Sequence, residues 1–487
     1  MESEEDEQRN YAHHHVMVVP YPAQGHINPM LNFSKRLAKS YGLEVTFATT
    51  VSIYNSMNNP DDIILDPSSS SSSSSVLQLA TISDGFDQGD VDLAESGLAL
   101  YHQRLESEGS KTLAELIRNS PHPIDCIIYD AFLPWALDVA KAFGIPGAVF
   151  FTQACTVNYL FYCVHHGLLK LPVSPSSFPI AVDGLQWLHL LDMPSYISTE
   201  DSYPVYRQML LNEFRNVHEA DFVLFNTVYE LEKEMVDSMS KVCPLLTIGP
   251  TIPSLYSDKR IKGDNDYGMN MFKLEHSSDC IINWLNTKPP RSVVYVSFGS
   301  WISLSTNQME ELALGLKATK LNFLWTVRSS EVSKLPRKFA EETSEKGLIV
   351  NWSPQLEVLA NEAVGCFVTH CGWNSTLEAL MLGVPMVGMP QATDQPTDAK
   401  IIEDLWKIGV RVKVDHDDHE EIIVRRQEIE FCIREVMEGD TAMQMRMNAK
   451  KLADVALQAI GDGGSSDINI RDFLSKLQLL TKSRNHI

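Results

Sequence analysis

The stretch FVTHCGWNSTLEALMLGVPMVGMPQATDQ, residues 367–395, holds the pattern on which the fold depends. An apolar run ends at His370, polar and aromatic residues follow, and an apolar pattern with helical spacing then resumes. This order predicts a buried strand, a short loop and a helix opened by Ser375. A hydrophobic core alone would not need such an interruption, so we expect the loop to bind a ligand.

The same alternation recurs in two halves of the chain. The first half opens with the apolar run VMVVP, the loop YPAQGHINP and a helix predicted from about Met30. The second opens with SVVYVSFGS and a helix through TNQMEELALGL. Further β-rich runs alternate with helical patterns: CIIYD, IPGAVFF, DFVLFNT, NFLWTV, GLIVN, VGCFVTH and PMVGMP. This alternation predicts an α/β protein with doubly wound parallel sheets.

The composition narrows the class of protein. Of 487 residues, 44% are hydrophobic and 21% charged, as in ordinary globular enzymes. The net charge of −23 argues against nucleic acid or an anionic membrane surface as partner. The N-terminus MESEEDEQRN lacks the features of a secretory signal, and no apolar run approaches the roughly 18 residues of a membrane span. With eight scattered cysteines, we expect a cytoplasmic protein with reduced thiols.

The loop after VGCFVTH lies where a phosphate would bind. In a parallel sheet, ligands collect beyond the carboxyl ends of the strands, next to helix N-termini that favour anions. Ser375 and Glu378 also have the spacing of a capping box, which alone would explain both residues. Capping does not explain the other notable residues of the stretch, which are His370, Trp373, Asn374, Asp394 and Gln395.

Residues 352–395 resemble the nucleotide-sugar box of plant secondary-product UDP-glycosyltransferases. The segment begins WSPQ, contains HCGWNSTLEAL and ends DQ, so its length, its order and both of its ends agree with that family. The resemblance extends from VMVVPYPAQGHINP to INIRDFLSKL. It implies the GT-B fold, in which two facing Rossmann-like domains have the active site in the cleft between them. It also implies UDP-glucose as the donor substrate, with no metal and no other cofactor.

The resemblance and the composition together suggest domain boundaries. The polar segment GPTIPSLYSDKRIKGDNDYGMN, broken by Pro and Gly, is typical of a linker. We expect an acceptor-binding domain over residues 1–250, a linker over 251–272 and a UDP-sugar-binding domain over 273–465. A C-terminal helix over about 466–487 is expected to pack back on the first domain. We expect the protein to be a monomer.

The resemblance implies a role for each residue of the box. Trp352 would stack on uracil, whose edge would meet the backbone of Ser353 and the side chain of Gln355. Family members often have Ala in place of Ser353, which a backbone contact tolerates. Glu378 would accept hydrogen bonds from the ribose hydroxyls. Contacts to the diphosphate are implied for His370, Asn374, Ser375 and Ser300, and contacts to the sugar for Thr152, Trp373, Asp394 and Gln395.

A metal is not needed for the departure of UDP, because helix-end N–H groups, a histidine and neutral donors can stabilise the charge on the leaving phosphate. The sequence does contain runs that could be metal ligands. The acidic runs 415–418 and 264–266 are better interpreted as solvated loops, and the histidines 13–15 as exposed residues.

His26 is the candidate general base. It follows the first strand on the ligand side of the sheet, and Asp130 ends the strand CIIYD. If the two loops adjoin, Asp130 can accept the Nδ1–H of His26, which leaves Nε2 to take a proton from an acceptor hydroxyl. The residues alone leave this pairing open, since separation in sequence says little about distance. The resemblance places the family's base and its supporting Asp at these positions.

The reaction expected from one base is a single displacement at the anomeric carbon, which inverts the α-linked donor to a β-glucoside. Aromatic and apolar residues crowd the first half, which favours a small hydrophobic aglycone. The sequence looks closest to the subgroup that acts on salicylate-like acids, thiohydroximates, terpenoids and steroids. We favour a terpenoid or steroid hydroxyl, with a carboxyl as a further possibility, and a phenolic, flavonoid or aromatic acid remains open as the acceptor.

Other classes of protein fit the residues less well. A nicotinamide dehydrogenase should show G-x-G-x-x-G after a strand, and neither YPAQGHINP nor SFGSWIS has this spacing. A retaining glycoside hydrolase needs paired acids, for which the sequence shows no motif. A non-catalytic UDP-sugar-binding protein would have no need of His26 and Asp130.

Overall fold

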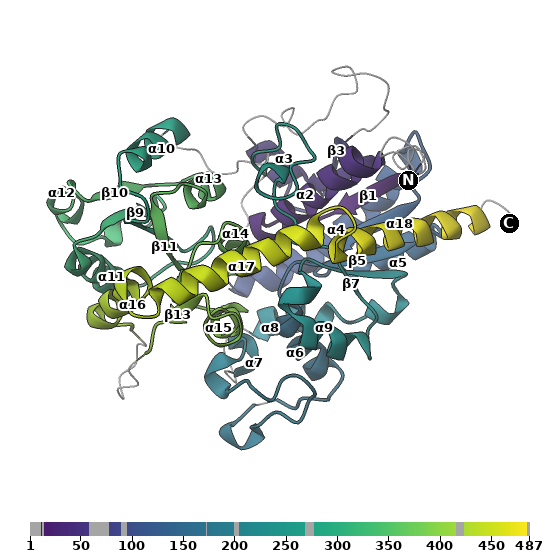
Figure 1. Ribbon diagram of the computed structural model, residues 1–487. Coiled ribbons are helices and arrows are strands. Elements are labelled where there is room, and N and C mark those ends of the chain that lie inside the picture. Colours follow the sequence, from purple (N-terminus) through teal and green to yellow (C-terminus); the bar gives the residue numbers. More distant parts are fainter. Residues whose placement is uncertain are drawn as a thin grey trace. The chain divides into compact units, whose positions relative to one another are not determined.

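The computed structural model describes residues 11, 14–57, 77–88, 95–171, 173–198, 204–267, 277–414 and 423–484. The protein forms two compact units (Figure 1). The first contains residues 1–190, 196–271 and 458–487, and the second contains 191–195 and 272–457. The functional boundaries expected near residues 250 and 272 stay a prediction.

A parallel sheet of seven strands, in the order β3-β2-β1-β4-β5-β6-β7, forms the centre of the first unit. Its strands are β1 (His15–Val19), β2 (Glu44–Thr50), β3 (Leu77–Ile82), β4 (Cys126–Asp130), β5 (Gly147–Phe151), β6 (Phe222–Phe225) and β7 (Leu246–Thr247). Val16 of β1 is paired with Val45 on one side and Cys126 on the other. The strand order therefore reverses between β1 and β4, which creates a ligand-binding position at their carboxyl ends.

The helices of this unit are α2 (Gln24–Tyr41), α3 (Val51–Ser56), α4 (Glu95–Asn119), α5 (Trp135–Ala142), α6 (Cys155–His165), α7 (Ser195–Ser198, of which Ser195 belongs to the second unit), α8 (Pro204–Asn212), α9 (Lys233–Ser240) and α18 (Ser465–Arg484). The prediction that the first helix begins near Met30 is wrong, because α2 begins at Gln24 and has Pro29 inside it. The proline removes one helical hydrogen bond without ending the helix. His26 therefore lies in the first turn of α2 rather than in a loop.

The C-terminal helix α18 belongs to the core of the first unit. Phe473 of α18 meets Phe222 of β6 edge to face, with ring centroids 4.8 Å apart. Ile470, Leu474 and Leu477 are fully or almost fully buried in the same hydrophobic cluster. This apolar face explains why the last helix of the chain folds onto its first half.

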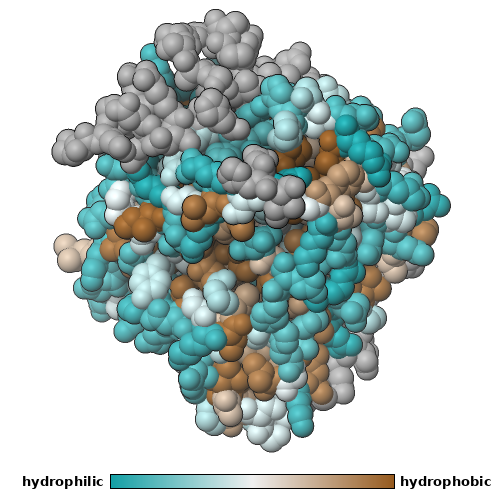
Figure 2. Space-filling model, turned by 90° about the vertical axis from the view of Figure 1, so that its right-hand side faces the viewer, coloured by the Kyte–Doolittle hydropathy of each residue, from teal (hydrophilic) through white to brown (hydrophobic). Residues whose placement is uncertain are grey.

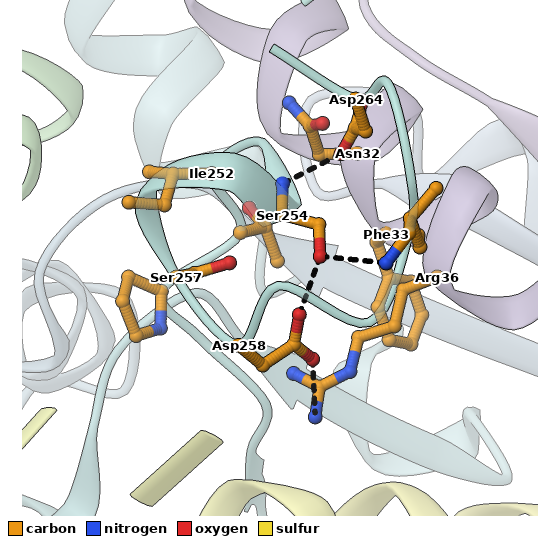
Figure 3. Close-up of a pocket in the computed structure, with 11 residues that line it drawn as sticks. Asn32, Phe33, Arg36, Ile252, Ser254, Ser257, Asp258 and Asp264 are labelled. Carbon is orange, nitrogen blue, oxygen red and sulfur yellow. Dashed lines mark hydrogen bonds and ion pairs between the residues drawn. The ribbon is translucent and has the colours of Figure 1, made fainter. Parts of the chain in front are cut away.

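Ion pairs attach the segment after β7 to α2, and Figure 3 shows the pair formed by Arg36 and Asp258. Lys35 Nζ lies 2.9 Å from Asp264 Oδ1, and Arg36 Nη2 lies 4.0 Å from Asp258 Oδ2. A cavity of about 20 Å³ between α2 and this segment has room for about one water molecule. The Ser254 N–H also donates to Asp264, over 2.6 Å. Asp264 is therefore a structural partner within the protein, not the solvated residue that the sequence predicted.

The other acidic run, 415–418, lies outside the described residues, as does residue 13. The prediction that the neighbouring histidines are exposed is wrong for His15, which is buried with Nε2 2.8 Å from Thr46 Oγ1. His14 pairs with Asp125 at 3.1 Å. Within the described ranges, no group of three or more His, Cys, Asp or Glu side chains is arranged to hold a metal ion.

The second unit has a parallel sheet of six strands, ordered β10-β9-β8-β11-β12-β13. The strands are β8 (Val293–Ser297), β9 (Asn322–Thr326), β10 (Gly347–Val350), β11 (Val364–Thr369), β12 (Met386–Gly388) and β13 (Gly409–Arg411). The helices are α10 (Ser278–Asn286), α11 (Thr306–Thr319), α12 (Phe339–Glu342), α13 (Gln355–Leu359), α14 (Trp373–Met381), α15 (Gln395–Lys400), α16 (Arg426–Glu438) and α17 (Ala442–Ile460), of which α17 ends in the first unit. The strand order reverses between β8 and β11, so both units have the predicted doubly wound architecture.

The surface mixes hydrophilic residues with smaller hydrophobic areas, as the face in Figure 2 shows. Scattered exposed apolar side chains such as Leu479 are normal on a folded protein. Among the described helices, none has the length and apolar character that crossing a membrane requires.

Candidate functional site

The carboxyl ends of β1, β4 and β5 bring together three of the predicted site residues. His26 follows β1, Asp130 ends β4 and Thr152 follows β5, and these strands are neighbours in the sheet. His26 Nδ1 lies 2.8 Å from Asp130 Oδ2 and 3.2 Å from Thr152 Oγ1. The His26 side chain is 16% exposed, whereas that of Asp130 is 1% exposed. A reachable imidazole is thus held by a buried carboxylate.

The pair determines which nitrogen of His26 carries the proton. An ionised carboxylate can only accept hydrogen bonds, so Nδ1 must be the protonated nitrogen and Nε2 keeps its lone pair. Asp130 is itself held in place, because its Oδ1 accepts the N–H of Phe132 over 3.0 Å. The backbone carbonyl oxygen of Asp130 accepts the N–H of Leu133 over 2.8 Å. The arrangement suits a base that takes a proton at Nε2.

Two rings that were not among the predicted site residues lie against His26, and a third ring, His102, lies behind one of them. Phe132 lies 4.5 Å and Tyr21 5.2 Å from the imidazole, centroid to centroid. Tyr21 stacks on His102 at 5.6 Å, and burial lowers the pKa of His102 to about 4. Burial also raises the pKa of the Tyr21 phenol, so both groups are neutral near pH 7. Tyr21 could have been found from its place in YPAQGHINP, but no sequence signal connects His102 of α4 to this loop.

The loop after β11 is shaped around His370. A Cβ atom added at Gly299 would lie 2.9 Å from the His370 imidazole, and one added at Gly372 would lie 2.6 Å from it. Glycine at both positions therefore allows the backbone to approach the ring closely. Cys371 has a left-handed φ of 67°, a strained conformation for a residue with a side group. Burial lowers the pKa of His370 to about 4. The histidine is therefore a neutral hydrogen-bonding group next to the N-terminus of α14.

The capping-box explanation of Ser375 and Glu378 is wrong. Helix α14 begins at Trp373, so Ser375 and Glu378 lie inside the helix. Its N-cap residue is Gly372, and no side chain caps the helix. Gln355 Nε2 instead donates to Ser375 Oγ over 2.9 Å and to Glu378 Oε2 over 2.8 Å. The two residues share a partner on α13, and the N-terminus of α14 is left facing the loop, where a phosphate is favoured.

The amide of Gln355 is also engaged on its other side. Its Oε1 accepts from the Tyr295 hydroxyl over 3.2 Å. Ser353 Oγ lies 2.9 Å from the Tyr295 hydroxyl and 2.9 Å from Thr326 Oγ1. Tyr295 and Thr326 were missed in the sequence, where each looks like a strand residue. Both N–H groups of the Gln355 amide are thus donated within the protein, and its oxygen already accepts one hydrogen bond. Only the remaining acceptor position of this oxygen is left for a contact with uracil.

The sugar end of the box lies between β12 and α15. Asp394 is the residue before α15, and Gln395 is its first residue. Gln395 Oε1 accepts from Gln391 N at 2.9 Å and Ala392 N at 3.0 Å. Thr393, with a left-handed φ of 60°, donates its hydroxyl hydrogen to Asp394. Gln395 can therefore offer a ligand its amide N–H more readily than its oxygen.

The remaining predicted residues differ in exposure. Trp352 and Asn374 are partly exposed, whereas Trp373 is 3% exposed and lies 5.8 Å from Trp406, ring to ring. Ser300 is partly exposed in the turn after β8, and its carbonyl accepts from Arg328. Arg328, a residue that sequence patterns did not point to, also holds the carbonyl of Ile302 and so orders this turn.

Two models of known protein families match the chain. Residues 193–449 match the family model UDP-glucoronosyl and UDP-glucosyl transferase, and residues 13–57 match a glycosyltransferase N-terminal domain model. The protein is 50% identical to UDP-glycosyltransferase 74F2 of Arabidopsis thaliana over 470 residues, with 95% of this chain and 98% of the relative covered. It is 48% identical to flavonol 7-O-beta-glucosyltransferase UGT74F1 of the same plant, with 96% and 98% covered.

A solved structure is similar over nearly the whole length of the protein. Os79 from O. sativa, in complex with UDP, has a TM-score of 0.86 and 39% identity and covers 95% of this chain and 100% of its own. Another structure of Os79 contains U2F and a trichothecene. The neighbours share the GT-B fold of two Rossmann-like domains that the sequence predicted. The chain therefore belongs to the plant UDP-glycosyltransferase family and is a glycosyltransferase enzyme that uses a UDP-sugar donor.

Proposed function

We propose that the enzyme transfers glucose from UDP-glucose to a hydroxyl, or a carboxyl, of a small hydrophobic aglycone, with His26 as general base and Asp130 as its support. The observation that carries this proposal is the 2.8 Å contact between His26 Nδ1 and Asp130 Oδ2. The contact leaves Nε2 basic, and the imidazolium that forms on proton transfer is stabilised by the buried carboxylate. The activated oxygen attacks the anomeric carbon opposite to departing UDP and yields a β-glucoside.

The donor is proposed to bind the second unit. Trp352 stacks on uracil, Glu378 accepts from the ribose, and His370, Asn374, Ser375 and Ser300 hold the diphosphate at the N-terminus of α14. Neutral donors and a helix dipole can stabilise the leaving phosphate, so the proposed step is not routed through a metal. Thr152, Asp394 and Gln395 contact the sugar. The Trp373 indole is buried against Trp406, so we assign its contact to its backbone N–H.

The acceptor class is proposed from the surroundings of the base. The rings of Tyr21 and Phe132 lie against His26, and neutral His102 adds no charge, which favours an apolar molecule. We propose a terpenoid or steroid alcohol, which the trichothecene bound to Os79 supports. A phenolic acceptor is the second candidate, because one relative is a flavonol glucosyltransferase.

The test is an assay of the purified protein with UDP-glucose and a panel of terpenoid alcohols, sterols, flavonols and aromatic acids. We expect acceptor-dependent release of UDP and a β-linked glucoside, identified by the NMR coupling of the anomeric proton. An α-linked product would contradict single displacement. A strong preference for flavonols or aromatic acids would move the acceptor to the second class and leave the base assignment intact.

A further inference from the structure

We propose that Tyr295, Ser353 and Thr326 form a positioning network for the donor: their hydroxyls orient the amide of Gln355 and, through it, the carboxylate of Glu378. The proposal rests on the proposed function, in which Glu378 accepts hydrogen bonds from the ribose. It goes beyond that function by assigning a role to three side-chain hydroxyls for which no contact with the nucleotide is proposed. The outcome it predicts is discrimination between ribose and 2′-deoxyribose.

The direction of every hydrogen bond in the network follows from the end at Glu378. A carboxylate only accepts, so the Gln355 NH2 group must face it, and the two N–H groups donate to Glu378 and Ser375. The amide oxygen then faces Tyr295, 3.2 Å away. The phenol has one hydrogen, which it donates to Gln355, and burial raises its pKa, so that hydrogen is retained.

The remaining bonds must then be donated toward Tyr295. Ser353 donates to the phenol oxygen over 2.9 Å, and Thr326 donates to Ser353 over 2.9 Å. All the hydroxyls therefore point along one path toward the carboxylate, an arrangement in which each bond polarises the next. A Gln side chain without such neighbours could turn its amide over, and its oxygen would then face Glu378.

The fold brings these residues together from separate strands. Tyr295 lies in β8 and Thr326 ends β9, while Ser353 follows β10 and Glu378 lies in the helix after β11. The four strands are adjacent in the sheet. The Tyr295 ring also stacks on Phe367 of β11, with centroids 4.9 Å apart. Removal of the hydroxyl alone leaves this stack in place, so the role of the hydroxyl can be separated from that of the ring.

The experiment measures the dissociation constants of UDP and 2′-deoxy-UDP by calorimetry for the full-length protein and its variants. We expect wild type to prefer UDP and Glu378→Ala to lose that preference. Tyr295→Phe should lower the ratio of the two constants by about 3- to 10-fold, the range of one hydrogen bond. Ser353→Ala should lower it in the same direction, and the double variant should be no worse than Tyr295→Phe, since both act through Gln355.

A general loss of stability would weaken the binding of UDP and of 2′-deoxy-UDP alike and leave the ratio of their dissociation constants unchanged. The matched control is Tyr129→Phe, which removes a buried phenol oxygen that has no hydrogen-bond partner in the described structure; its ratio should equal that of wild type. If Glu378→Ala loses the preference while Tyr295→Phe and Ser353→Ala keep it, the positioning network is overturned. If Glu378→Ala keeps the preference, the proposed ribose contact fails, and the positioning role fails with it.

Discussion

Two histidines occupy related places in the two sheets, but their surroundings differ. His26 follows β1, the first strand of its unit, and faces Asp130 at the end of β4, across the reversal of strand order. His370 follows β11, across the corresponding reversal in the second sheet, and the residue facing it after β8 is Gly299. The His26 imidazole thus has a carboxylate as its partner. The His370 imidazole instead faces a glycine, whose lack of a side chain lets the backbone come close to the ring.

The different surroundings suit the same type of residue to opposite tasks. A buried carboxylate fixes the tautomer of His26 and stabilises its protonated form, which suits proton transfer. Burial without a carboxylate lowers the pKa of His370 to about 4, so this ring stays neutral, and its single N–H can be donated either to the backbone of Ser297 or to an anion. Variants of the two sites test this division between a base site and a donor site.

The largest effect is expected for His26→Ala. An aliphatic alcohol is hardly ionised near neutral pH, so loss of a positioned base should lower kcat by about 10²- to 10⁴-fold. The affinity for UDP should change little, because the nucleotide is assigned to residues 352–395. The matched control is His14→Ala, which breaks the similar pair with Asp125 at the amino ends of the same strands. Near wild-type kcat of His26→Ala with an aliphatic alcohol would place the base elsewhere.

A smaller effect is expected for Asp130→Ala. His26 keeps a basic nitrogen but loses the charge that supports its protonated form, so kcat should fall by about 10- to 10³-fold, less than in His26→Ala. The double variant should be no slower than His26→Ala, since Asp130 acts only through the histidine. Steady-state kinetics of the three variants provide the test, and additive losses would show that Asp130 has a separate role.

On the donor side, Trp352→Ala should weaken UDP binding by about 1–3 kcal/mol, the usual loss for one base–aromatic stack. The indole is partly exposed and lies outside the hydrophobic core, so the melting temperature without UDP should stay close to that of wild type. Calorimetry and thermal unfolding separate the two effects. A large fall in melting temperature with unchanged UDP affinity would make Trp352 a packing residue instead.

The pH dependence of stability distinguishes the two histidines further. The folded-state pKa of His370, about 4, lies below its unfolded value of about 6.5. Between these values the unfolded protein binds more protons, so stability is complete above pH 6.5 and falls as the pH is lowered. The loss from this group should reach about 2 kcal/mol at pH 5. Urea unfolding at pH 7.5 and 5 should show a smaller loss in His370→Gln, and an equal loss would contradict the assignment.

The smallest effect concerns the choice of sugar. The Gln395 oxygen already accepts two backbone N–H groups, so its amide N–H is the group we expect to meet the sugar hydroxyls. We predict that UDP-glucose is preferred to UDP-galactose by at least about tenfold in kcat/KM, the scale of one hydrogen bond. Gln395→His should reduce this preference. Equal use of UDP-glucose and UDP-galactose by the wild-type enzyme would refute the predicted preference.

Much of this enzyme could be predicted from short stretches of sequence. Continuous apolar runs such as CIIYD and VGCFVTH predict buried parallel strands, because both faces of such a strand are covered. The spacing between Trp352 and Gln395 indicates the family. His26 follows one strand and Asp130 ends another, which puts both on the ligand side of a sheet. These inferences succeed because periodicity and spacing are local properties of the sequence.

What the sequence alone could not decide depends on which strands are neighbours. Asp130 lies 2.8 Å from His26 only because β4 pairs with β1, and strand order is chosen by long-range packing. Local rules were overridden where such packing offered a better partner: Ser375 and Glu378 have the spacing of a cap, yet both accept from Gln355. Tyr295 looks like any strand residue until the adjacent strands bring Ser353 to its hydroxyl. The candidate residues of the site could thus be named from the sequence, but the contacts that orient them exist only in the folded protein, since hydrogen bonding requires proximity in space.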